Sequence, residues 1–110
     1  MAEASLKLLV LKTNQLDALC EFYGLLGIEF TAERHGNGPD HFAGKAGDCV
    51  FEIYPLRADS FTADKSTRLG FAVENLAAQF QAFETAGIRI DCKPEPTAWG
   101  VRAVVRDPDG

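Results

Sequence analysis

The sequence contains no long hydrophobic run, because its longest uninterrupted aliphatic stretch is residues 8–11. A membrane-spanning helix needs about 20 apolar residues, so no membrane partner is expected. The opening residues, MAEASLK, also lack the charged and then apolar pattern of a secretory signal. Basic residues are outnumbered, with 11 Lys and Arg against 16 Asp and Glu, and they form no stripe that could neutralise phosphates. We therefore expect no nucleic-acid partner either.

Cysteine is scarce, and its pattern is neither paired nor clustered. Cys20, Cys49 and Cys92 are far apart, and no C-x-x-C pair is present. An odd number of distant cysteines indicates reduced thiols, not a disulfide framework or a zinc site. We therefore expect a cytoplasmic protein, in which Cys20 fills space on the apolar side of a helix.

The sequence also lacks the usual motifs of nucleophilic catalysis. It has no G-x-S-x-G elbow and no cysteine paired with a nearby histidine. The glycine-rich residues 35–38, HGNG, precede a predicted strand, whereas a phosphate-binding loop precedes a helix. No catalytic residue can be named on this basis, and whether the protein is an enzyme stays open.

One pattern occurs twice, in residues 9–30 and again in residues 69–90, at a shift of 60 positions. Each copy has a strand-like stretch, then apolar residues at helical spacing, and then a glycine, Gly27 or Gly87. A glycine at the end of a helix can adopt the positive φ that terminates it. Asn14 is expected to cap the first helix through its side chain.

Stretches rich in β-forming residues follow both helices. We expect strands at residues 28–33, after a hairpin loop at residues 35–41, and at residues 49–55, 69–73, 88–92 and 101–105, with a loop at residues 93–100. The predicted order is β-α-β-β-β followed by β-α-β-β, in one α+β domain. A ferredoxin-like domain also places two helices on a sheet, but it has two strands between its helices where this sequence predicts three. We expect module one at about residues 5–56, a connector at about 57–65 and module two at about 66–110 of a domain covering residues 1–110.

Four motifs occur in a fixed order: LDALCEFYGLLG at 16–27, VFEIYP at 50–55, LGFAVENL at 69–76 and WGVRAVVRDPDG at 99–110. In this order they resemble the vicinal oxygen chelate superfamily, which includes glyoxalase I, bleomycin-resistance proteins and extradiol dioxygenases. The resemblance implies tandem βαβββ modules that form a curved mixed sheet around a cleft. The last strand of the second module is missing from this sequence. The resemblance also implies a homodimer.

Metal enzymes of this superfamily place their ligands at four equivalent strand positions. The resemblance carries these positions onto Leu8, Glu52, Arg68 and a position beyond Gly110. Leucine has no lone pair and arginine stays protonated, so only Glu52 is a usable ligand. We therefore expect no metal cofactor and a role in binding a small organic molecule. A metal-dependent lyase, isomerase or dioxygenase using Zn, Ni or Fe is the second possibility, and a closed cleft with only an assembly role is the third.

Alternation along the strands divides the expected core from the expected cleft. Glu52, Tyr54 and Arg68 should face the cleft, where Arg68 near Glu52 would anchor an anionic or carbonyl-bearing molecule. A salt bridge that replaces the ion structurally is the alternative for these two residues. The helix-facing core should include Leu9, Leu11, Phe51, Leu69 and Phe71.

Three further residues are candidates for binding a ligand in the cleft. His41 is one of them. Paired histidines on a solvated turn are more often plain surface residues, but His35 and His41 beside Asp40 could also bind zinc or nickel adventitiously. Trp99 could stack on a planar ligand or cover the end of the sheet. Arg102 can face the cleft or solvent, because its register is not set by the sequence.

Overall fold

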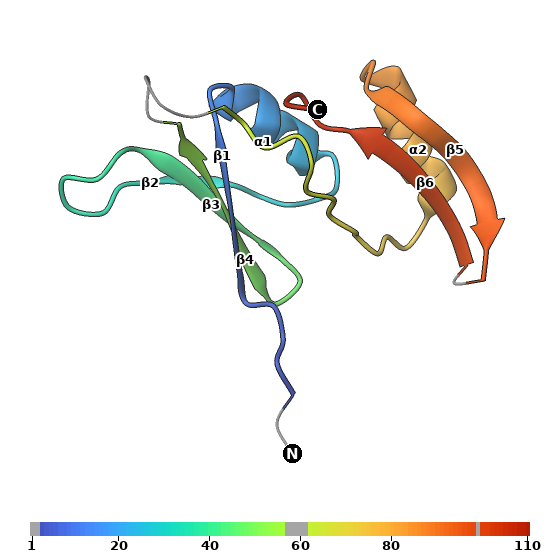
Figure 1. Ribbon diagram of the computed structural model, residues 1–110, viewed down its shortest axis with the longest axis horizontal. Coiled ribbons are helices and arrows are strands. Elements are labelled where there is room, and N and C mark those ends of the chain that lie inside the picture. The colour runs from blue at the N-terminus through green and yellow to red at the C-terminus, as the bar shows by residue number, and fades with distance from the viewer. Residues whose placement is uncertain (1–2, 57–61, 99) are drawn as a thin grey trace.

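The computed structural model describes residues 3–56, 62–98 and 100–110. Two helices and two β-sheets confirm the α+β class. The elements, in chain order, are β1 (Leu8–Thr13), α1 (Leu16–Gly24), β2 (Thr31–Glu33), β3 (His41–Ala46), β4 (Cys49–Pro55), α2 (Leu76–Thr85), β5 (Arg89–Thr97) and β6 (Gly100–Arg106). Figure 1 shows β1 to β4 and α1 on one side of the molecule and α2, β5 and β6 on the other.

The first sheet has the strand order β1-β4-β3-β2. Its β1 and β4 are parallel, whereas β2 and β4 each pair antiparallel with β3. The central strand β4 has the bounds predicted from the sequence, and its alternation is clear. Phe51 and Ile53 are completely buried, while Glu52 and Tyr54 point to the opposite face and are only partly buried.

The second sheet is a hairpin of β5 and β6, and it corrects one prediction. The loop expected at residues 93–100 is wrong, because β5 continues through Pro94 and Pro96 to Thr97. Proline cannot donate a ladder hydrogen bond, so it is tolerated in a strand that has a partner on one side only. The register also slips between Ile90 and Glu95, where the hairpin is irregular.

The strand expected at residues 69–73 is also wrong. This segment belongs to no strand, and it forms no backbone hydrogen bond with any residue in the described part of the chain. In the first module, β1 is held by parallel pairing with β4, which is three strands further along the chain. The described residues that follow β6 form the turn of residues 107–110, and their backbone does not pair with this segment. Side-chain packing therefore holds this segment in place.

The core lies between the two helices and the first sheet. Phe22 of α1 and Phe83 of α2 stack with their ring centroids 5.4 Å apart. Gln79 of α2 also donates a 2.8 Å hydrogen bond to the carbonyl of Leu25, so the two modules are joined through their helices. The core residues expected from the sequence are confirmed, since Phe51 is buried and the other four pack against the same cluster: Leu9, Leu11, Leu69 and Phe71.

The helix ends confirm one prediction and correct another. Gly27 and Gly87 have φ values of 89° and 75°, as expected for residues that follow a helix. Asn14 does not cap α1; the N-cap is Gln15, whose side chain makes no capping bond. The backbone N–H of Gln15 donates a 2.9 Å hydrogen bond to Thr13 Oγ1.

Candidate functional site

Three ionisable side chains lie on one face of the first sheet because of its register. Glu33 on β2 is directly opposite His41 on β3. Glu52 on β4 is opposite Ala43, and this makes it a diagonal neighbour of His41. Side chains two residues apart on a strand share a face, so these groups lie on the face opposite the buried Phe51.

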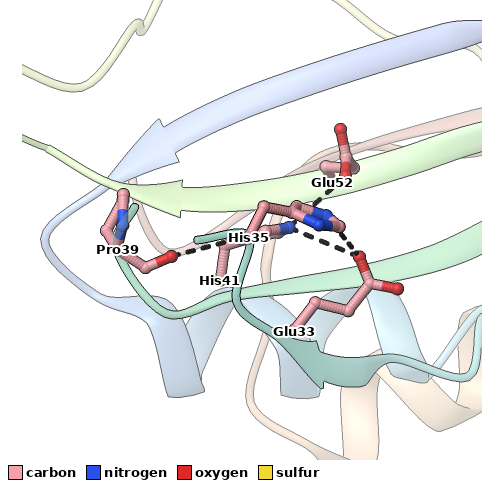
Figure 2. A network of polar contacts seen from close by, with 5 residues as sticks. All are labelled: Glu33, His35, Pro39, His41 and Glu52. Atoms are coloured by element: carbon pink, nitrogen blue, oxygen red, sulfur yellow. Dashed lines mark hydrogen bonds and ion pairs between the residues drawn. The ribbon is translucent and has the colours of Figure 1, made fainter. Parts of the chain in front are cut away.

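The donor atoms on this face are close to one another. His41 Nε2 lies 3.4 Å from Glu33 Oε1 and 3.5 Å from Glu52 Oε2. His35, in the loop between β2 and β3, places its Nε2 3.3 Å from the same Glu33 oxygen. Figure 2 shows the two imidazoles and the two carboxylates converging. All four donor atoms lie within 4.8 Å of one another, so we call these residues the four-ligand cluster.

His41 is the rigid centre of this cluster. Its side chain is 1% exposed, and its ring stacks on Tyr54 with centroids 4.0 Å apart and planes 7° apart. Its Nδ1 lies 3.3 Å from the carbonyl oxygen of Pro39, an atom that can only accept a hydrogen bond. Nδ1 therefore carries the hydrogen in this contact. Nε2 is buried and has no hydrogen-bond partner among the described residues.

Exposure increases across the cluster from its centre to its rim. The Glu52 side chain is 16% exposed, the Glu33 side chain 40% and the His35 side chain 72%. The cluster thus opens to solvent on the side of His35. Burial, and then the negative charges of Glu52 and Glu33, raise the pKa of the Tyr54 hydroxyl above its ordinary value. The Tyr54 hydroxyl therefore remains protonated at neutral pH and can donate a hydrogen bond.

A groove of about 1570 Å³ runs between the two modules beside this cluster. Its walls include Tyr54 from β4, Arg102 from β6 and Arg68, which begins the stretch of residues 68–73 that belongs to no strand. The wall mixes aromatic, aliphatic and charged side chains. Concave surfaces of this composition are typical of sites for small organic molecules.

The cations in the groove differ in how they are paired. Arg106 Nε donates to both carboxylate oxygens of Asp91, at 3.0 and 2.8 Å, and this hydrogen bonding lowers the pKa of Asp91. Arg102 is 3.9 Å from Glu95, a weak and exposed contact. Arg68 forms no ion pair or hydrogen bond with a residue in the described ranges. Its charge contributes to the lowered pKa of Asp91 in the same groove, but its guanidinium donors are not taken up by a salt bridge with a described residue.

Five of the six candidate residues from the sequence fall into two groups. His41, Glu52 and Tyr54 lie together on the first sheet. Arg68 and Arg102 line the groove, and no ion pair links Arg68 to Glu52 within the described residues. Trp99 lies outside the residues that the structure describes.

Glu33 is the candidate site residue that the sequence analysis missed. The available signal was the pattern E-R-H before the hairpin loop, because Glu33 and His35 are two positions apart. A hairpin that brings His41 back opposite Glu33 unites all three residues. The four positions implied by the resemblance do not form such a set, since Leu8 and Arg68 offer no metal ligand.

Neither described helix is long and apolar enough to cross a membrane.

The Glyoxalase/Bleomycin resistance protein/Dioxygenase superfamily matches residues 5–110 of the chain. A virulence protein of Salmonella typhimurium is 21% identical with a TM-score of 0.68, over 100% of this chain and 93% of that one. Lactoylglutathione lyase from Agrobacterium tumefaciens is 19% identical with a TM-score of 0.62, over 100% and 90% of the two chains. A bleomycin resistance determinant encoded on transposon Tn5 is 22% identical with a TM-score of 0.63, over 97% and 92%. These three likenesses show the fold alone. No curated protein sequence matches the chain significantly.

Proposed function

This chain belongs to the Glyoxalase/Bleomycin resistance protein/Dioxygenase superfamily, and we propose that it binds a small anionic organic molecule in the groove between its modules. The observation that carries the proposal is Arg68, a cation that forms no salt bridge or hydrogen bond within the described residues, in the wall of that groove. A guanidinium recognises a carboxylate through two parallel hydrogen bonds. Binding does not require a metal at the four positions that the superfamily uses.

Tyr54 and Arg102 support the same proposal from other parts of the groove wall. Tyr54 can donate a hydrogen bond to a ligand oxygen, because a tyrosine hydroxyl keeps its proton at neutral pH. Arg102 is held only by the long contact to Glu95, so it can turn toward a ligand at little cost. A carboxylate joined to an apolar body matches this combination of donors and hydrophobic wall.

Binding of aliphatic and aromatic carboxylic acids to the purified protein tests the proposal. A panel of such acids is first compared by thermal shift, since a ligand that binds only the folded state raises the Tm. For each hit, titration calorimetry compares wild type with Arg68→Ala. We expect the affinity to fall by roughly tenfold or more, the loss that follows from removing a charged hydrogen bond of about 1.5–3 kcal/mol.

Arg68→Lys and Lys93→Ala are the matched variants. Arg68→Lys keeps the positive charge but lacks the planar guanidinium that forms two parallel hydrogen bonds, so we expect an intermediate affinity. Lys93 is an exposed cation on β5 that does not line the groove, and Lys93→Ala should bind as wild type does. An unchanged affinity in Arg68→Ala would refute the anchor role.

A metal-dependent lyase, isomerase or dioxygenase is the second candidate function. The four-ligand cluster favours it, because two imidazoles and two carboxylates converge on one face. One structural relative is a lactoylglutathione lyase. Turnover of a candidate substrate by the metal-loaded protein, lost in the metal-stripped protein, would favour this candidate over pure binding.

We further propose that the protein acts as a homodimer in the cytoplasm. The support for dimerisation is an apolar strip at the edge strand β1, where Leu6, Leu8 and Val10 are 68%, 54% and 38% exposed. Light scattering after gel filtration should give twice the chain mass for wild type and for Val101→Lys, and the chain mass for Leu8→Lys. A wild-type monomer would contradict the proposal. Three free cysteines support a reducing compartment.

A further inference from the structure

We propose that the four-ligand cluster of Glu33, His35, His41 and Glu52 binds one divalent transition-metal ion of the zinc type. None of the four side chains lines the groove that contains Arg68. The proposed metal site and the proposed anion site can therefore be tested independently of each other. Each residue offers one nitrogen or oxygen donor, and the set combines imidazoles with carboxylates.

The unsatisfied nitrogen of His41 is the first argument for a cation. With its hydrogen on Nδ1, facing the Pro39 carbonyl, the imidazole presents a lone pair on Nε2. This lone pair is buried and faces carboxylate oxygens of Glu33 and Glu52, at 3.4 and 3.5 Å. In the neutral state of His41, three electron-rich atoms at this separation repel one another. A cation between them converts the repulsion into coordination.

The spacing of the donors is the second argument. Zinc lies about 2.0–2.2 Å from nitrogen and oxygen ligands, so neighbouring ligands around a tetrahedral ion are roughly 3.4 Å apart. Three histidine–carboxylate separations in the cluster are 3.3, 3.4 and 3.5 Å. All four donors lie within 4.8 Å, so completing the set needs only a small movement of an exposed side chain. His35, at 72% exposed, has that freedom.

The type of ligand selects the class of ion. Imidazole nitrogen suits Zn, Ni, Cu and Fe, whereas Ca²⁺ and Mg²⁺ prefer sites made only of oxygen. His41 has the support expected of a metal ligand, because Pro39 holds its other ring nitrogen and Tyr54 covers its face. The open side near His35 leaves room for a water molecule or a ligand oxygen on the ion.

The proposed site differs from the one that the resemblance implies. Only Glu52 is common to both, and the other three ligands come from β2, β3 and the loop between them. All four ligands belong to the first module. The site therefore needs no contribution from the second module or from a second copy of the chain.

Zinc binding by the metal-stripped protein tests the site directly. The protein is treated with dipicolinate, desalted and titrated calorimetrically with Zn²⁺, while Co²⁺ provides a visible d–d absorption that reports its coordination. We expect one equivalent per chain and a higher Tm in the loaded protein. Glu33→Gln and Glu52→Gln should each weaken binding by roughly tenfold or more. Asp40→Asn, an exposed carboxylate of the same hairpin at 80%, should bind as wild type does.

The stability of the metal-free variants separates a cation from a proton on His41 Nε2. If the metal-free cluster is repulsive, Glu52→Gln should raise the Tm of the stripped protein while it weakens zinc binding. If instead Nε2 carries a proton and pairs with Glu52, the same substitution should lower the Tm, and nitrogen NMR should show hydrogens on both ring nitrogens with zinc present. That second result, or zinc binding equal in wild type, Glu33→Gln and Glu52→Gln, would overturn the proposal.

Discussion

Tyr23 of α1 donates a 2.6 Å hydrogen bond to the Asp107 carboxylate, 84 positions further along the chain. Asp107 opens the D-P-D-G turn after β6, and Gln15 reaches the same turn through 2.8 and 3.2 Å hydrogen bonds to Asp109 and Pro108. The turn therefore joins the end of the second module to the first helix. Burial, and then the hydrogen bond and charge of Asp107, raise the pKa of Tyr23 well above its ordinary range.

Removal of the Tyr23 hydroxyl should destabilise the protein at neutral pH. A hydrogen bond to a charged group contributes about 1.5–3 kcal/mol, and Tyr23→Phe leaves the ring packing in place. Urea unfolding at pH 7 should show a loss of that size. A loss below about 0.5 kcal/mol, the range of ordinary surface substitutions, would show that the contact is weak in solution.

The same contact predicts how stability changes at alkaline pH. Because the pKa of Tyr23 is raised in the folded state, its stabilising effect is complete below the unfolded pKa of about 10 and is lost as the pH rises above it. The difference in unfolding free energy between wild type and Tyr23→Phe should therefore shrink above about pH 10. Paired urea titrations at several alkaline pH values measure it. A difference that stays constant would contradict the linkage.

Asn75 is the N-cap of α2, whereas Asn14 lies one position before Gln15, the N-cap of α1. The Asn75 side chain accepts a 3.0 Å hydrogen bond from the backbone N–H of Ala78. Asn75→Ala should cost about 1 kcal/mol of unfolding free energy. Asn14→Ala, the matched control, should change it by no more than about 0.5 kcal/mol. Equal effects in chemical denaturation would show that capping does not distinguish the two sites.

Gly44 on β3 is needed because the backbone of a neighbouring segment approaches it closely. A Cβ at this position would lie 2.6 Å from the Glu29 carbonyl oxygen and 2.9 Å from Ile28 Cγ2. Gly44→Ala should therefore destabilise the protein by about 1–3 kcal/mol.

Gly24, the last residue of α1, is the matched control for Gly44. A Cβ there would meet nothing within 4 Å. Gly24→Ala should stabilise the protein by about 0.5 kcal/mol, because alanine loses less conformational freedom in a helix. The two substitutions should thus shift the Tm in opposite directions. The same shift in both would mean that crowding at Gly44 relaxes without cost.

Cys20 should react slowly with thiol reagents while the protein is folded. Burial, and then the charge of Asp17, raise its pKa from 9.0 to about 11. Because the thiolate is the reactive form, iodoacetamide labelling near pH 8 should be slower by roughly tenfold or more than in the urea-unfolded chain. Mass spectrometry of the Cys20 peptide measures both rates. Equal rates would show that the thiol is accessible and unperturbed.

Much of the fold could be predicted from local patterns. The two helices follow from apolar residues at helical spacing and from Gly27 and Gly87 at their ends. The bounds of β4 follow from a run of side chains that point alternately to the two faces of the sheet. The same alternation predicts which residues form the helix-facing core. The four motifs identify the family for the same reason, since each depends on residues close together in the chain.

The tertiary structure decided which segments have partners and which side chains meet. Residues 68–73 resemble β1 in sequence but pair with no described strand, because pairing depends on a second segment far away. Pro94 and Pro96 read as a loop, yet they lie in β5 because β6 pairs with one side of it only. Glu33 becomes a neighbour of His41 and Glu52 through the registers of β2, β3 and β4. Those registers, and the buried nitrogen that they leave without a partner, depend on contacts that no local pattern records.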